Sequence, residues 1–270
     1  MMDSRFTSIH NLGHYLAYIW QYRGMLRQMV GKDFKGRFKN TIFGYFWHLL
    51  NPLSQIVIYL LIFTVIFGRD VPNYWVYVST GMFAFSFFMT STAGSSNCIV
   101  NNSNVVTKMA MAREIIPISK VLMNLITLSI SYCLLLLLMA IFGVEITVNI
   151  LWVPVIVALL LVFSLGMVLL LCSVTVYVRD IANIVGILFG CLMFAIPIMY
   201  LAETRSTPMM EVFWSINPLY YYIEIIHDVF FWGNPPDMYM VCVCILSSIV
   251  MFAVGLYVFK KLERGFAERL

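Results

Sequence analysis

Glu224, His227 and Asp228 are the residues of this chain whose types and spacing come nearest to acid–base chemistry. Separations of three and four residues place side chains on one face of a helix, where two carboxylates and an imidazole could form a hydrolytic cluster. The same residues also suit a solvated or gating role near a membrane surface. The spacing alone leaves both interpretations open.

Other signatures of catalysis or nucleotide binding are absent from the sequence. Gly31-Lys32 is followed by Asp33, where a phosphate-binding loop needs Ser or Thr. There is no His-Glu-x-x-His and no nucleophile elbow. A lone histidine in an apolar run, such as His48, is typical of a packed, hydrogen-bonded residue, and the six cysteines lie mostly in apolar runs as expected for packed thiols. The sequence therefore predicts no catalytic residue, no metal site and no cofactor in this chain.

The composition indicates a membrane protein. Of 270 residues, 61% are hydrophobic and 11% charged, with a mean hydropathy of +0.89, whereas soluble domains carry roughly 25% charged residues. The first residues show no cleavable signal peptide. Since a span needs about 20 apolar residues, we predict an all-α protein with six transmembrane helices, at 46–67, 74–95, 121–143, 150–177, 181–202 and 238–259.

The positive charges fall almost entirely on one side of these six spans. Among the 17 Lys and Arg residues, only Arg69 and Arg205 lie on the other side. By the positive-inside rule, both termini are predicted to be cytoplasmic. This asymmetry explains the net charge of +4, so a nucleic-acid partner is not expected.

Two further segments are apolar in part but do not span. Residues 12–39 combine apolar residues at helical spacing with cations near the end, which predicts an amphipathic helix on the cytoplasmic membrane surface; a soluble helix packed on a partner is the alternative. Residues 203–237 predict two short external re-entrant or interfacial helices, broken at Asn217-Pro218 and stopped at Gly233. Irregular backbone at membrane depth has to be covered, so this second segment is predicted to cap a cavity.

No acidic residue lies in the middle of a span, which argues against an ion-coupled carrier and against an intramembrane enzyme. Energy for transport must then come from a partner. Segment 104–119, with Lys108, Arg113 and Glu114, predicts a short cytoplasmic helix that ends at a proline and docks into a groove of that partner. The alternative is a solvated loop. The pair Arg179-Asp180, between spans four and five, is predicted as a second contact or as a topology anchor.

Several short motifs resemble, in order and spacing, the membrane subunit of type-2 ATP-binding-cassette exporters of polysaccharides. The O-antigen exporters of Gram-negative bacteria are the most similar branch, with teichoic acid exporters near. The stretches that carry the resemblance are Asp33-Phe34-Lys35-Gly36-Arg37-Phe38, Gly44-Tyr45-Phe46-Trp47, Asn51-Pro52-Leu53, Arg113-Glu114-Ile115-Ile116-Pro117, Val178-Arg179-Asp180-Ile181, Ile196-Pro197-Ile198-Met199-Tyr200, Asn217-Pro218-Leu219 and Phe259-Lys260-Lys261-Leu262-Glu263. Two departures are Met111-Ala112 and Ile196, where the family has Phe-Pro and Thr.

The resemblance implies one transporter domain over residues 1–270, with 12–39 as interface helix, 104–119 as coupling helix and 203–237 as external gate. It implies a homodimeric pore in the bacterial inner membrane and two copies of a separate ATPase, which binds ATP and magnesium. The implied cargo is a lipid-linked polysaccharide of O-antigen type. Export of teichoic acid, capsule, a drug or a lipid by the same fold is the alternative, and a membrane-bound glycan- or lipid-modifying enzyme is the alternative outside transport.

Aromatic rings suit a channel along which sugars slide, because the ring faces stack without a single strong contact. The candidates are Phe46, Tyr59, Phe63, Phe85, Phe87, Phe88, Phe194 and Tyr200, with packing in the core or against lipid as the alternative. The residues predicted to close the external mouth are Trp214, Asn217, Pro218, Tyr220, Tyr221 and Tyr222, with an interfacial anchor as the alternative.

Overall fold

The fold is a bundle of helices. The computed structural model describes residues 20–36, 41, 46–62, 72–108, 112–202 and 207–270. Within these ranges the chain is helical and has no strand, which confirms the predicted all-α class. Three described helices are long and apolar enough to cross a membrane: α7 (Ile115–Ile141), α8 (Val153–Tyr177) with the 3₁₀ turn η5 (Val148–Trp152) before it, and α13 (Met238–Leu262).

The helices described at the other predicted spans are shorter, and residues 63–67 of the first predicted span lie outside the described ranges. These helices are α3 (Trp47–Leu60), α4 (Tyr74–Ser91) and α9 (Ile181–Ala195). With 15 residues, α9 extends about 22 Å, less than the roughly 30 Å of a hydrocarbon core. It ends because Ile196 precedes Pro197 and is extended (φ −94°, ψ 143°), as a residue before proline prefers. The prediction of a helix through 202 was therefore too long.

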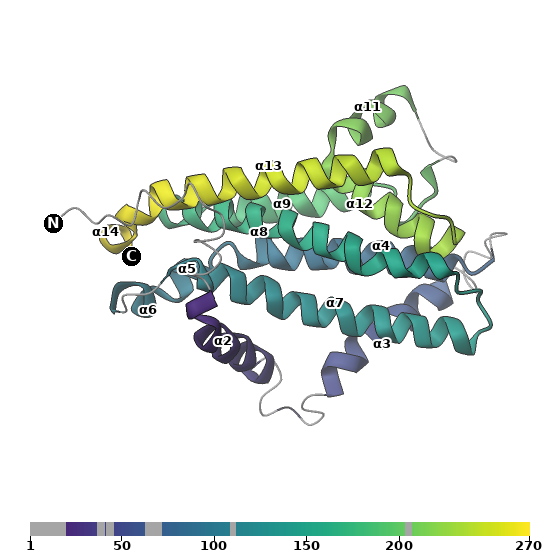
Figure 1. The fold of residues 1–270 in the computed structure, drawn as a ribbon, viewed down its shortest axis with the longest axis horizontal. Coiled ribbons are helices and arrows are strands. Elements are labelled where there is room, and N and C mark those ends of the chain that lie inside the picture. The colour runs from purple at the N-terminus through teal and green to yellow at the C-terminus, as the bar shows by residue number, and fades with distance from the viewer. Residues whose placement is uncertain (1–19, 37–40, 42–45, 63–71, 109–111, 203–206) are drawn as a thin grey trace.

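The long helices run side by side and give the bundle two distinct ends (Figure 1). One end, called the α14 end below, gathers α5 (Cys98–Asn101), α6 (Ser103–Lys108), the start of α7 and α14 (Phe266–Arg269). The opposite end holds α12 (Pro218–His227) and the π-helical turn η6 (Asp228–Trp232), with α11 (Pro208–Ile216) standing away from the bundle. The α14 end thus collects segments that the charge pattern assigns to one side of the membrane.

Helix α4 forms the centre of the core. Fourteen of its 18 residues are buried, among them the rings of Trp75, Phe83 and Phe88. Helices α8 and α13 pack against each other at very short range. A Cβ on Gly255 would overlap the carbonyl oxygen of Gly166, and a Cβ on Gly166 would overlap the backbone at Met251. Small residues that let two backbones approach closely are a common way to join helices in membranes.

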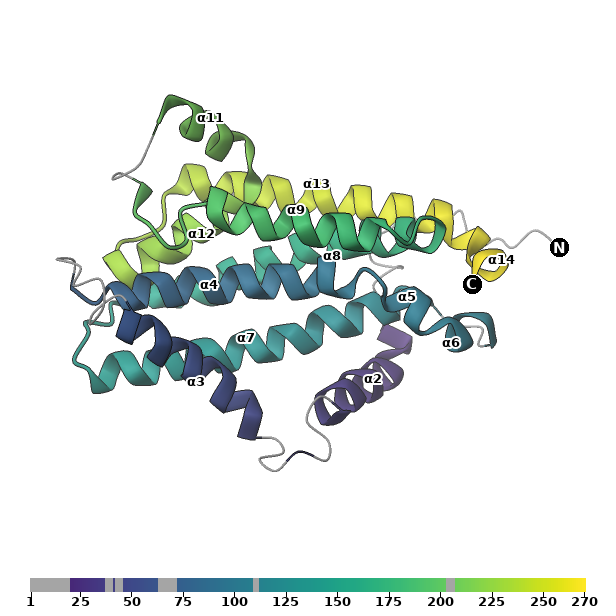
Figure 2. The same cartoon turned by 180° about the vertical axis from the view of Figure 1, so that it is seen from behind.

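Helices α2 (Arg23–Gly36) and α3 lie along one flank of α4 and α7, as the rear view shows (Figure 2). No residue of α2 is buried, and its half-buried residues, such as Met25, Met29 and Phe34, recur at helical spacing. The helix predicted within segment 12–39 is confirmed for Arg23–Gly36, and its place on a membrane surface stays a prediction. Residues 12–19 and 37–39 of that prediction lie outside the described ranges.

Candidate functional site

Within segment 104–119, the proline does not end a helix as predicted. Helix α6 ends at Lys108, residues 109–111 lie outside the described ranges, and α7 starts at Ile115. Pro117 therefore lies in the first turn of α7 rather than at the end of a helix. A proline is tolerated there because the first amide groups of a helix have no intrahelical acceptor. The charged residues Arg113 and Glu114 occupy the turn just before α7.

Glu114 is at the centre of an ionic cluster that joins the start of α7 to the end of α13. Its side chain is fully buried and forms an ion pair with Lys260, whose ammonium also lies 3.1 Å from a carboxylate oxygen of Glu263. The guanidinium of Arg113 donates to the backbone oxygen of Glu263. The contact joins residues 150 positions apart, so the α7 and α13 ends must move together or break it.

The electrostatics of this cluster follow from burial and the two carboxylates. Burial alone would lower the pKa of Lys260, but the carboxylates of Glu114 and Glu263 outweigh it and raise that pKa. Burial and then the neighbouring Glu114 raise the pKa of the Glu263 carboxyl, against the opposing effects of Lys260 and Arg113. Lys260 is thus held in its charged form, as a cation between two carboxylates must be.

The sequence predicted that Arg113 or Glu114 touches an ATPase. The structure places the Glu114 carboxylate inside the chain, where it holds Lys260, while Arg113 stays half-buried at the surface of the turn. Direct contact with an ATPase stays a prediction. For Glu114, any influence on such a partner would pass through the α7–α13 contact.

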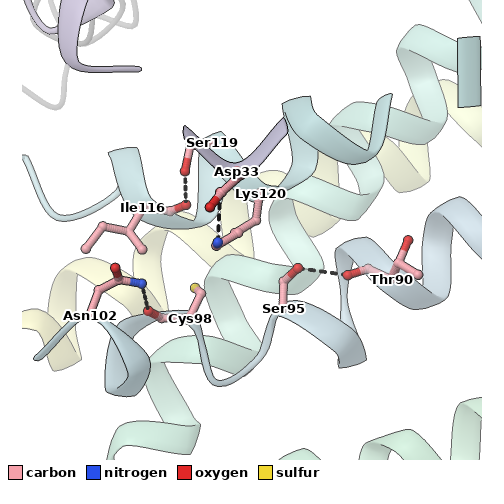
Figure 3. Close-up of polar contacts among 8 residues, drawn as sticks. All are labelled: Asp33, Thr90, Ser95, Cys98, Asn102, Ile116, Ser119 and Lys120. Atoms are coloured by element: carbon pink, nitrogen blue, oxygen red, sulfur yellow. Dashed lines mark hydrogen bonds and ion pairs between the residues drawn. The ribbon is translucent and has the colours of Figure 1, made fainter. Parts of the chain in front are cut away.

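A second ion pair fixes α2 against α7. Lys120 Nζ lies 2.8 Å from Oδ2 of Asp33, and the two residues come from helices far apart in the sequence (Figure 3). One residue further along α2, the ring of Phe34 stacks on His48 of α3 at 4.1 Å between centroids. His48 also has the Phe34 carbonyl oxygen 3.4 Å from Nε2, which fits the predicted packed histidine. Helix α2 is thus tied to both α3 and α7.

Arg179 and Asp180 lie exposed in the turn between α8 and α9. Tyr177, at the end of α8, donates its hydroxyl to the carbonyl oxygen of Leu262 at 2.9 Å. This contact puts the turn beside the last residues of α13, at the α14 end. Both charged side chains are therefore available at the same end as the ionic cluster, and their role as a second contact stays a prediction.

The predicted channel aromatics do not form one continuous lining in this chain. Phe85, Phe87 and Phe88 are each 3% exposed, because central helix α4 is surrounded by other helices and its rings pack inward. Phe46 and Phe194 are exposed, Tyr59 and Tyr200 are half-buried, and Phe63 lies outside the described ranges.

The 203–237 segment contains two short helices that meet at the predicted break. Asn217 ends α11 and caps α12, accepting a hydrogen bond from the Leu219 amide at 3.1 Å. A left-handed Gly233 (φ 66°) ends the π turn η6, as predicted. Asn residues are favoured at caps because the side-chain oxygen satisfies an unpaired helix amide.

The aromatic residues of this segment are tied back to the bundle. Trp214 Nε1 donates to the carbonyl oxygen of Ala195 at 2.8 Å, and its ring stacks with Tyr220 at 5.6 Å. Tyr221 donates to the carbonyl oxygen of Ser215 within the segment at 3.1 Å. Tyr222 is fully buried and donates to Cys244 O of α13 at 2.8 Å. Pro218 begins α12 and is half-buried. Closure of a pore by these residues stays a prediction.

The buried position of His227 excludes the possible hydrolytic cluster. This side chain is fully buried, its ring lies 3.7 Å from that of Tyr77, and a Cβ on Gly81 would lie 2.5 Å from its Nε2. Burial lowers the pKa of His227 to about 3, whereas burial and the nearby Asp237 raise the pKa of Asp228 to about 6. An imidazole enclosed by α4 is out of reach of a water-borne substrate, so its role is in packing.

A polar cavity between α3, α4 and α7 was not found by sequence reasoning. It has a volume of about 210 Å³, and its lining residue His48 contacts Phe34 of α2. Its polar lining residues are His48, Asn51, Ser54, Gln55, Ser86, Thr90, Asn124, Thr127 and Ser131. Of the predicted channel aromatics, Phe87 contributes to this lining. The sequence signal for it is a set of uncharged polar residues four apart inside apolar runs, such as Asn51 with Gln55 and Ser86 with Thr90.

Comparison with known proteins gives a consistent result. The family model described as "ABC-2 type transporter" matches residues 25–231. An "O-antigen export system permease protein RfbA" of Myxococcus xanthus is 27% identical over 253 residues, covering 93% of this chain and 97% of that protein. Two proteins with the same description from Klebsiella pneumoniae are 27% and 28% identical over 247 residues, covering 91% of this chain and 95% of each.

The matched region begins within α2 and ends within η6, so it contains Arg113 and Glu114 of the ionic cluster and the two short helices before α13, whereas Lys260 and Glu263 lie beyond it. The likeness to the permeases extends beyond it over nearly the whole of each chain. On this basis the chain belongs to the ABC-2 type transporter family.

Proposed function

We propose that this chain is the membrane-spanning pore subunit of an ATP-driven exporter that moves a lipid-linked polysaccharide of O-antigen type across the bacterial cytoplasmic membrane. The observation that carries the proposal is the end-to-end likeness to three permeases described as O-antigen export proteins. The long apolar helices support a membrane-embedded chain. ATP hydrolysis is assigned to a separate ATPase, as the family implies.

The arrangement of charged segments supports a topology with six spans and both termini in the cytoplasm. Helix α2, helices α5 and α6, the Arg179-Asp180 turn and α14 all lie at the α14 end. If that end is cytoplasmic, the ATPase meets the Arg113-Glu114 turn and the Arg179-Asp180 turn together. The same orientation leaves α11, α12 and η6 at the external end, where the proposed gate is expected.

The coupling mechanism we propose uses the Glu114–Lys260 pair. A bound ATPase that moves the Arg113-Glu114 turn also moves α13, because the buried ion pair makes separation of the start of α7 and the end of α13 costly. Tyr222 of α12 is bonded to Cys244 and Ser248 of α13, so motion of α13 reaches the proposed gate. ATP can shift the pore only if the ATPase binds its two states unequally. A homodimer with two ATPase copies completes the pore in this proposal.

A deletion experiment tests the function. Removing the gene should eliminate long surface polysaccharide and accumulate the lipid-linked polymer inside the cell, and the parent chain should restore export. An Arg179→Ala variant should restore less export at an equal membrane level. Normal surface polysaccharide in the deletion strain would contradict the proposal. Loss of teichoic acid or capsule instead would assign another glycan to the same pore.

A further inference from the structure

The polar cavity between α3, α4 and α7 lies among helices that are predicted to span the membrane. Asn51, Ser54 and Gln55 of α3 and Ser86 and Thr90 of α4 line it and are exposed. Polar side chains inside spans are costly against lipid and normally face protein, water or a ligand. These residues all face one cavity, so they form a built surface rather than scattered polar positions.

Three hydroxyl groups of the cavity wall already donate hydrogen bonds within the chain. Thr90 donates to Ser86 O at 2.8 Å, Ser131 to Thr127 O at 2.9 Å and Ser54 to Asn51 O at 2.8 Å. Their oxygens can still accept hydrogen bonds, because a hydroxyl has two lone pairs. This part of the wall therefore suits a ligand that donates.

The amides of Asn51 and Gln55 add groups that both donate and accept. The two residues lie one turn apart on α3, and neither amide has a hydrogen-bond partner in the part of the chain that the structure describes. An amide presents two N–H donors and one carbonyl acceptor. A ligand that meets this wall must therefore donate and accept along its length, as neighbouring hydroxyl groups do.

The charge and the volume of the cavity further limit the class of ligand that it can bind. His48 is the one titratable residue among those that line the cavity, and Phe34 covers its ring, so a phosphate or a metal ion would find no counter-charge there. Phe83, Phe87 and Leu128 supply an apolar patch, which suits the C–H face of a sugar ring. A volume of about 210 Å³ is below the roughly 300–1,000 Å³ of pockets for drug-sized molecules.

The cavity lies beside the basic helix of the chain. Its lining residue His48 stacks on Phe34 of α2 and has the Phe34 carbonyl oxygen 3.4 Å from Nε2. Arg23, Arg27, Lys32 and Lys35 of α2 are all exposed. A charged head group could therefore sit at α2 while an attached neutral ring entered the cavity.

We propose that the α3–α4–α7 cavity binds one neutral sugar ring, with Asn51 and Gln55 as the specificity-determining contacts. The inference rests on the proposed function and deepens it, because it places a sugar at the flank of the subunit, before any passage through a dimeric pore. The sugar could arrive on a membrane-embedded lipid or from the water phase, and both sources present the same hydroxyl groups.

Photo-crosslinking of the full chain, assembled with its ATPase in nanodiscs, tests the site. Three diazirine probes are compared: a neutral sugar on an alkyl chain, the same sugar as a free oligosaccharide, and the alkyl chain without sugar. We expect sugar-dependent labelling of peptides containing residues 51–55 and 86–90. Labelling by the alkyl sugar alone would show that the sugar arrives on a membrane lipid. Labelling by the free oligosaccharide as well would show that it arrives from the water phase. Either outcome supports the site.

Matched variants measure how much the cavity residues contribute to the labelling. Asn51→Leu with Gln55→Leu should reduce labelling about tenfold, since each lost hydrogen bond contributes about 0.5–1.5 kcal/mol. If that variant fails to assemble, Thr127→Val provides a smaller change in the cavity and should reduce labelling at least twofold. Ser129→Ala is the control, because Ser129 is exposed on the same helix, makes a similar bond to Leu125 O and does not line the cavity.

The result that overturns the site is equal labelling by the sugar-free alkyl probe, labelling elsewhere, or no effect of the cavity variants. This outcome is separable from failure of the proposed function. Intact polysaccharide export with no sugar in the cavity removes the site alone. Labelling of the cavity in a chain whose deletion leaves surface polysaccharide normal removes the exporter proposal and leaves a sugar site.

Discussion

Replacing Glu114 by Gln should destabilise the chain, because it leaves the Lys260 ammonium in a mostly buried position without its closest carboxylate. Glu114 is fully buried, and the Lys260 side chain is 22% exposed. Removing one partner of a buried pair costs about 3–5 kcal/mol. Lys260 keeps Glu263 at 3.1 Å and some access to water, so we expect the lower end, about 3 kcal/mol. For a chain of this size that is a fall in Tm of roughly 6–10 °C.

The assay is thermal unfolding of the detergent-solubilised full chain, combined with a double-mutant cycle. Glu114→Gln, Lys260→Gln and the double variant should show a coupling energy of about 2 kcal/mol, as groups in direct contact do. Lys261→Gln is the matched control, because Lys261 is the exposed neighbour on α13 and should change Tm little. Additive single effects, or a Glu114 variant as stable as the Lys261 control, would refute the claim that this pair joins α7 to α13.

Three further outcomes follow from the packing. Gly255→Val should prevent the close approach of α8 and α13 and abolish a folded, monodisperse chain in size-exclusion chromatography, whereas Gly186→Ala, which meets nothing within 4 Å, should not. Asn217→Ala should cost about 1 kcal/mol in thermal unfolding through loss of the α12 cap, and Asn217→Asp should restore it; equal loss in both would rule out capping. The folded state holds His227 neutral down to about pH 3, so between about pH 6.5 and 3 the unfolded chain binds more protons and stability falls as pH is lowered. His227→Phe should remove about 2 kcal/mol of that loss of stability at pH 5. Asp228 makes the opposite contribution in both proteins, because its raised pKa favours the folded state on acidification. An unchanged dependence of stability on pH in the variant would contradict the buried, neutral imidazole.

The long helices were predictable because apolar length is a local property of the sequence. Segments 121–143, 150–177 and 238–259 correspond to α7, α8 and α13, although α7 starts six residues earlier, at Ile115. The break at Asn217-Pro218 was also local, since Asn caps a helix and Pro starts one. The position of a residue in the bundle, in contrast, depends on residues that are far away in the sequence. Phe85 and Phe88 look alike in sequence whether they line a channel or fill a core, and only the central position of α4 decides for the core.

The charged residues show the same limit. Glu114 precedes a long apolar run, which placed it correctly near an end of the bundle, but its partner Lys260 is far away in the sequence. No periodicity could pair them. The cavity on α3, α4 and α7 likewise needs three helices to face one another, and each contributes only two to four uncharged polar residues. A single uncharged polar residue in an apolar segment predicts little. Only the packing of the three helices shows that these residues line one cavity.

ATP-dependent movement of glycan in proteoliposomes tests the central claim most directly. The purified chain is reconstituted with its ATPase and with lipid-linked polysaccharide labelled on the sugar, and export is measured as transfer of label across the membrane, where an added glycosidase reaches it on one side alone. The account predicts transfer that requires both proteins and hydrolysable ATP. It also predicts that the Glu114→Gln variant, assembled with equal ATPase, hydrolyses ATP but transfers less label. Equal transfer without this chain, or without ATP, would contradict the assignment of this chain as the pore of an ATP-driven exporter.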